Sequence, residues 1–240
     1  MPPTPDRTLA PERFAQGMSF DEYVAYTATP DNLARESGWW LGTVRRDLSD
    51  LLRQWYAGPA RMSAAQTAAI RWLAARPDGP ARILVIAEEW SSDCRRDVTM
   101  LARMAEAGGL ELRIFPRDGQ RLGRGPRADP AESPNADLMN MFLREQDGQT
   151  FQSIPIAAFY TKDFQYLWHY TEFPAIYHKS RLADAVRAPR AGESPEQTWD
   201  RFMREWRELQ LSPFFPIWTS ASASEILSAL YERVTIGSVA

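Results

Sequence analysis

The stretch from Ile83 to Phe115 carries the pattern that most constrains the fold of this chain. Ile83 to Ile86 is an unbroken apolar run, typical of a strand that is covered on both faces. A helix over about Cys94 to Ala107 follows, ended by Gly108-Gly109, and Leu110 to Phe115 forms a second apolar strand. Strand, helix and strand in about thirty residues predict a βαβ unit and therefore an α/β fold.

Further elements are predicted after this unit. Pro116 to Pro134 is a loop rich in Pro, Gly and Arg, longer than most connections inside a compact domain, and is therefore either functional or disordered. Asn135 is expected to cap a helix running to about Glu145. Ile156 to Tyr160 and Phe164 to Tyr170 are expected to pair as a β-hairpin.

Helical patterns precede and follow this region. Before it, Ser19 can cap a helix over 20–28, helical spacing runs through 33–56, and Ser63 with Gln66 has the form of a capping box. After it, helices are expected over 177–186, 195–209 and 224–234, broken by an aromatic, proline-containing link over 212–218. We therefore expect a helical extension at 1–78, an α/β domain at 79–188 and a second helical extension at 189–240.

Composition excludes several classes of function. The net charge is −3 and charges of both signs are interspersed, so no broad surface for nucleic acid or an anionic membrane is indicated. No stretch approaches the ~20 apolar residues of a membrane span and no secretory signal is evident, so a cytoplasmic location is expected. Cys94 is the only cysteine, which rules out an intrachain disulfide, and with only two histidines we expect neither a metal nor another cofactor.

Two short motifs lie at the junctions of the predicted α/β domain. Trp90-Ser91-Ser92-Asp93-Cys94 follows the first strand and opens the next helix, and Ser153-Ile154-Pro155 precedes the hairpin. In this order the chain resembles the thioredoxin-like superfamily over roughly Arg82 to Tyr170. It is most similar to a bacterial family with a W-C-x-D-C site. The second strand of that family has a sequence like L-R-I-F-x-R-D, which Leu112 to Asp118 match here. The resemblance implies a thioredoxin-like fold, with a central mixed sheet flanked by helices, and a cis-proline at Pro155.

The departures from that pattern bear on function. Ser91 stands where thioredoxins carry the attacking cysteine, and a hydroxyl neither attacks sulfur well nor stores two electrons. Val85 stands where many thioredoxins bury a carboxylate that accepts the proton of the resolving thiol. The ordinary dithiol cycle is therefore not expected within this chain.

Ser91 and Cys94 are the candidate catalytic residues, and each has a plainer alternative. Cys94 can be a monothiol whose pKa is lowered by the helix N-terminus, or a buried leftover of the motif. Ser91 can hydrogen-bond the thiolate of bound glutathione, as serine does in some glutathione transferases, or only cap the helix. Those transferases, however, place the thioredoxin domain before their helices.

The candidate substrate-binding residues are Trp90, Ser92, Asp93, Ile154 and Pro155. In the family, the backbone of the residue before the cis-proline, here Ile154, pairs with an extended substrate or glutathione. Simple packing can also explain Trp90, an ordinary strand start can explain Pro155, and a helix-dipole contact can explain Asp93. We assign no metal ligand.

Other charged and aromatic residues have mainly structural interpretations. Glu88 and Glu89 are expected to be surface charges at the strand end. The arginines of the long loop suggest either an anion-binding lid or a solvated, mobile loop; they are Arg117, Arg121, Arg124 and Arg127. The tryptophans of the extensions are expected to pack against the domain, unless they form an exposed partner surface; they include Trp39, Trp40, Trp55, Trp199, Trp206 and Trp218.

The sequence thus predicts a thioredoxin-like protein with a degenerate Ser-x-x-Cys site. Its predicted function is a monothiol redox role through Cys94, acting on a protein thiol or disulfide or on glutathione. The alternative is a non-enzymatic module that binds a peptide or partner in the thioredoxin groove, and a peroxidase is a lesser third because the peroxiredoxin motif is absent. Homo-oligomerisation through the helical parts is compatible with the sequence.

Overall fold

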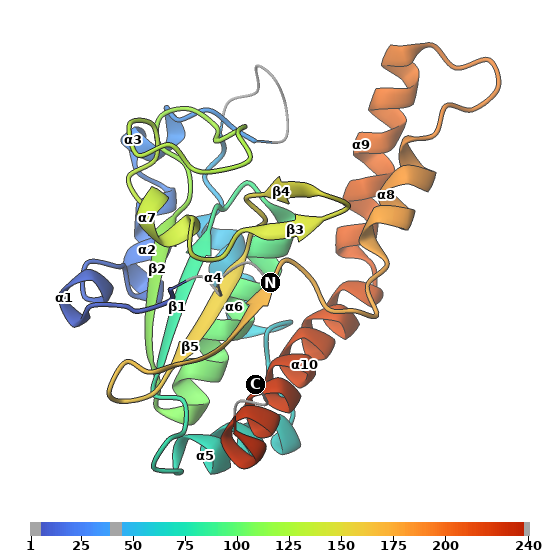
Figure 1. Ribbon diagram of the computed structural model, residues 1–240. Helices are drawn as coiled ribbons and strands as arrows, with labels where there is room; N and C mark the ends of the chain where they lie inside the picture. The colour runs from blue at the N-terminus through green and yellow to red at the C-terminus, as the bar shows by residue number, and fades with distance from the viewer. Residues whose placement is uncertain (1–5, 39–44, 238–240) are drawn as a thin grey trace.

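A mixed four-stranded sheet forms the centre of the protein (Figure 1). The computed structural model describes residues 6–38 and 45–237. The strand order is β2-β1-β5-β6, with β1 parallel to β2 and antiparallel to β5, and with β5 and β6 paired as a hairpin. The bounds are Arg82–Ala87 for β1, Glu111–Pro116 for β2, Ile156–Tyr160 for β5 and Tyr166–Thr171 for β6. The predicted α/β fold, with a mixed sheet and helices added at both ends, is confirmed.

Helix α6 (Ser92–Gly108) connects the two parallel strands and ends as the sequence indicates. Gly109 adopts a left-handed φ of 66°, which a glycine reaches without steric cost and which closes the helix. Helices α4 (Ser49–Ala57), α5 (Ala64–Ala74) and α10 (Phe214–Ile236) pack against α6 (Figure 1). Because β1 and β5 are central and buried almost throughout, their apolar runs form the middle of the core.

The N-terminal extension contains α1 (Pro11–Phe14), α2 (Phe20–Thr27) and α3 (Pro30–Leu33). The predicted cap at Ser19 and the capping box at Ser63 are both present. Each serine hydroxyl accepts the backbone N–H of the third helical residue, and the side chain of that residue accepts the backbone N–H of the serine. The predicted continuous helix over 33–56 is wrong, because residues 34–38 and 45–48 are not helical and α4 begins only at Ser49. Leu41 and Val44 of that predicted helix, with Trp39 and Trp40, lie outside the described residues.

A small hairpin stands where the sequence analysis placed a helix up to Glu145. Helix α7 (Ala136–Met139) is one turn long, without a side-chain cap from Asn135, and the strands β3 (Arg144–Gln146) and β4 (Gln149–Phe151) follow it. Asp147 and Gly148 connect these strands with φ values of 51° and 73°. An Asp-Gly pair with two positive φ values is a favoured two-residue hairpin turn, and this explains why the helix stops early.

The last helix of the predicted domain and the first helix of the C-terminal extension form a pair that projects from the sheet (Figure 1). Helix α8 (Lys179–Arg187) packs on α9 (Pro195–Leu211). The predicted link over 212–218 is wrong for most of its length, since α10 begins at Phe214. Pro216 lies in the first turn of α10, where its missing N–H costs no hydrogen bond. None of the described helices combines the length and apolar character needed to cross a membrane.

Aromatic side chains attach this extension to the rest of the protein. The Trp55 ring lies 5.1 Å from Phe215, and Trp218 stacks on Tyr177 at 4.0 Å between centroids. Trp206 is also buried, whereas Trp199 is 47% exposed. The packing role expected for the tryptophans therefore holds for Trp218, whereas Trp55 contacts Phe215 of α10 and Trp206 packs between α8 and α9.

Candidate functional site

The Ser91 to Cys94 turn begins α6 directly after β1. Ser91 is the helix N-cap, and its Oγ accepts the Cys94 N–H at 3.5 Å. Cys94 itself is completely buried, and the Glu88 N–H donates to its Sγ at 3.4 Å. Burial raises the pKa of the Cys94 thiol well above its ordinary value, because the charged thiolate is poorly solvated there. Cys94 is therefore a neutral thiol beneath the turn rather than an exposed nucleophile.

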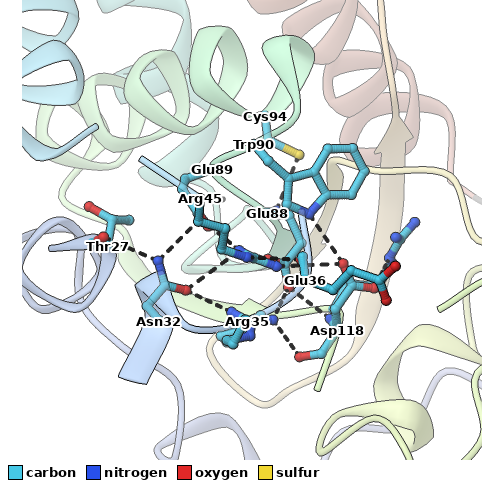
Figure 2. Close-up of polar contacts among 12 residues, drawn as sticks. Thr27, Asn32, Arg35, Glu36, Arg45, Glu88, Glu89, Trp90, Cys94 and Asp118 are labelled. Carbon is cyan, nitrogen blue, oxygen red and sulfur yellow. Dashed lines mark hydrogen bonds and ion pairs between the residues drawn. The ribbon is translucent and has the colours of Figure 1, made fainter. Parts of the chain in front are cut away.

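A buried cluster of carboxylates and arginines lies beside this turn (Figure 2). Arg45 donates to Glu88 at 2.8 Å and to Glu89 at 2.6 Å, and Arg35 donates to Glu88 at 2.7 Å. The expectation that Glu88 and Glu89 are surface charges is wrong, since they are 0% and 2% exposed. Their charge is tolerated because the N-terminal extension supplies both guanidinium groups. Burial nevertheless raises the pKa of Glu88, reinforced by the nearby Asp118 carboxylate.

Trp90 is held by the same cluster. Its indole N–H donates to Asp118 at 3.2 Å, and the Arg117 guanidinium lies 5.4 Å from its ring centroid. Gly38 of the N-terminal extension lies so close to the indole that a Cβ at this position would collide with the ring. One edge of the site is therefore built from the N-terminal extension and the start of the long loop.

A second buried ionic group surrounds the next residues of α6. Asp93 and Asp97 pair with Arg96 at 3.0 Å and 2.6 Å, and Lys179 of α8 pairs with Asp93. Burial lowers the pKa of Lys179, but the Asp93 and Glu172 carboxylates outweigh this effect and raise the pKa overall. Asp93 is thus an attachment point for α8 rather than only a partner of the helix dipole.

The peptide bond between Ile154 and Pro155 is cis, as the resemblance implied. Ile154 lines a cavity of about 860 Å³ together with Trp90 and Ser91; we call this cavity the groove. Its other walls are residues 123–126 of the long loop, residues 148–153 around β4, and the side chains of Lys179 and Arg187 from α8. Gly38 of the N-terminal extension, Arg117 and Glu172 also line the groove, so the N-terminal extension, the long loop and α8 all contribute to it.

Comparison with known proteins agrees with this architecture. A family model described as thioredoxin matches residues 59–122, which include β1, the Trp90 to Cys94 motif, α6 and β2. The fold is thioredoxin-like. A search of curated proteins gave no match.

Two solved structures are similar over most of their length. One is a protein of unknown function from Pseudomonas aeruginosa, with 14% identity, a TM-score of 0.48, and coverage of 91% of this chain and 94% of the other. The other is an HIV epitope scaffold, with 16% identity, a TM-score of 0.46, and coverage of 92% and 96%.

The thioredoxin-like fold brings some of the predicted site residues together and separates others. Trp90, Ser91 and Ile154 all line the groove. Ser92 and Asp93 are 2% and 0% exposed and do not line it, because their side chains are buried at the first turn of α6. Within residues 6–38 and 45–237, no three His, Cys, Asp or Glu side chains are grouped to hold a metal ion.

The long loop and α8 contribute residues to the groove that were not among the site residues predicted from the sequence. Arg117 is 7% exposed and donates to Asp118 and to the Gln152 carbonyl, so this part of the loop is anchored rather than solvated. Arg124 also lines the groove, and an anion-binding role for the loop arginines stays a prediction. Lys179 and Arg187 also line it, but no local pattern in the sequence indicates that α8 reaches the site.

Proposed function

We propose that this chain is a thioredoxin-fold binding module whose groove holds an extended peptide segment of a partner protein without thiol chemistry. The observation that carries the proposal is the separation of the groove from the thiol. Trp90, Ser91 and Ile154 line the cavity, while Cys94 lies beneath with no exposed surface. A ligand in the groove therefore meets a hydroxyl and an indole rather than a sulfur atom.

A monothiol reaction would need a different arrangement at Cys94. A thiol attacks a disulfide or peroxide as its thiolate, and the attacked sulfur or oxygen must reach it in line. Cys94 is inaccessible, and its pKa is raised by burial, so both requirements are unmet. Formation of a mixed disulfide with glutathione or with a protein would require the start of α6 to open first.

The main chain at Ile154 favours a peptide as the ligand. Within the described part of the chain, neither the N–H nor the C=O of Ile154 has a hydrogen-bond partner, although Ile154 is only 5% exposed. Main-chain groups that have no partner within the protein are available to pair with a ligand. An extended peptide lying in the groove can supply the partners by β-type pairing, which gives affinity through the backbone of the ligand.

The test is binding of an array of random octapeptides by the labelled full chain. Ser153 lines the groove, so Ser153→Trp places an indole inside it, whereas Ser180→Trp adds the same side chain at an exposed position outside the lining. We expect the wild type, Ser180→Trp and Cys94→Ala to bind the same peptides and Ser153→Trp to lose them. Absence of binding, equal binding by Ser153→Trp, or loss of binding in a folded Cys94→Ala protein would overturn the proposal.

A further inference from the structure

The groove is lined by more positive than negative side chains. Arg117, Arg124, Lys179 and Arg187 contribute to its wall, and Glu172 is the one carboxylate that lines it within residues 6–38 and 45–237. None of the four cations belongs to a core strand or to α6. They come from the long loop and from α8, so the charge of the groove is set by segments added around the sheet.

Not all of these charges are equally available to a ligand. Arg117 is paired with Asp118 in a buried position, and Lys179 is paired with Asp93 and Glu172. Arg124 pairs with Glu36, but its side chain is 54% exposed, and ion pairs at such positions are weak and easily exchanged. Arg124 can therefore turn toward a ligand at little cost.

Arg187 is the cation most open to a new partner. In residues 6–38 and 45–237 no carboxylate pairs with it, and its guanidinium lies 4.9 Å from the centroid of the Phe202 ring. That contact fixes the side chain but satisfies none of its N–H donors. A guanidinium held in this way is suited to a carboxylate, which accepts two parallel hydrogen bonds from it.

The groove is lined by apolar side chains as well as charged ones. Phe151 at the end of β4 is 41% exposed, and Trp90 is half-buried. Side chains of an extended peptide alternate between its two faces. A ligand that places an apolar residue against Phe151 and Trp90 can therefore present acidic residues toward Arg124 and Arg187.

We infer that the groove selects acidic extended segments, with Arg187 and Arg124 as the specificity-determining residues. This inference rests on the proposed function and names its ligand class. Charge selection at exposed rim positions acts through modest interactions, each sensitive to salt. Specificity should therefore decline as ionic strength rises, while binding through the backbone of the ligand persists.

The experiment uses three octapeptide pools that are identical except for Glu, Gln or Lys at two fixed positions. Affinity of the full chain is measured from Trp fluorescence at low and high salt. We expect the Glu pool to bind best and the Lys pool worst. Arg187→Gln should lower the affinity for the Glu pool by about two- to fivefold and leave the affinity for the Gln pool unchanged. Arg204→Gln, an exposed change on α9 outside the groove lining, serves as the matched control.

The outcomes separate the inference from the proposed function. Equal affinity for the three pools, or equal effects of Arg187→Gln and Arg204→Gln, would overturn the acidic preference while leaving peptide binding intact. Failure of every pool to bind would overturn the proposed function and the inference together. Circular dichroism of each variant shows whether a lost affinity reflects a lost contact or a lost fold.

Discussion

Replacement of Arg45 by Met tests the buried cluster that supports the groove. The Arg45 side chain is 0% exposed and pairs with three carboxylates, Glu88 at 2.8 Å, Glu89 at 2.6 Å and Asp118 at 4.0 Å. Met keeps much of the volume but removes the charge, which leaves Arg35 as the remaining guanidinium paired with Glu88. Removing one partner of a buried ion pair costs about 3–5 kcal/mol. Since a domain is stable by only about 5–15 kcal/mol, the loss should be large.

The assay is urea unfolding followed by circular dichroism, with Arg46→Met as the matched control. Arg46 is the next residue and is exposed, so its replacement should change the free energy of unfolding by less than about 0.5 kcal/mol. The deficit of Arg45→Met should be smaller at pH 5 than at pH 8, because an uncompensated buried carboxylate can be protonated. If the unfolding free energies of Arg45→Met and Arg46→Met differ by less than about 1 kcal/mol, the reasoning is refuted.

Three further predictions concern the thiol site and the sheet edge. Purified protein should not catalyse dithiol-driven insulin reduction above background, because Ser91 replaces the attacking thiol; turnover like that of an ordinary thioredoxin would contradict this. Oxidised Ser91→Cys should lose two hydrogens by intact mass, because residues 91 and 94 are one helical turn apart and their side chains can form a disulfide; an unchanged mass would show that the motif is misaligned. Burial lowers the pKa of His169 from 6.5 to about 4. Between these values the unfolded chain binds a proton that the folded chain does not, so stability should fall by about 1.4 kcal/mol per pH unit on acidification, and His169→Gln should flatten this dependence in urea titrations.

The elements predicted correctly are those specified by neighbouring residues. The apolar run of β1, the Gly109 cap of α6, the Ser19 cap and the capping box at Ser63 each act over a few residues, and the structure contains all of them. The helix predicted up to Glu145 rests on a cap by Asn135 that does not form, and the chain from Arg144 pairs instead as a hairpin around the Asp147-Gly148 turn.

The elements that could not be predicted depend on contacts between distant residues. Glu88 and Glu89 look like surface charges unless Arg35 and Arg45, more than forty positions earlier, are known to reach them. The same holds for Lys179 and Arg187, which reach the groove only because α8 folds back beside it. Trp90, Ser91 and Ile154 could be assigned to the groove because a resemblance, rather than a local pattern, supplied the three-dimensional arrangement.

Alkylation of Cys94 by iodoacetamide tests most directly whether the site works without thiol chemistry. Mass spectrometry follows this single cysteine across pH in native protein and in a sample denatured in urea. Because burial raises the pKa of Cys94 and closes access to Sγ, native protein should show negligible alkylation through pH 9, while the denatured sample reacts readily near the ordinary thiol pKa of about 8.5. Fast alkylation of native protein at neutral pH, blocked by glutathione, would contradict the account and restore a monothiol redox role.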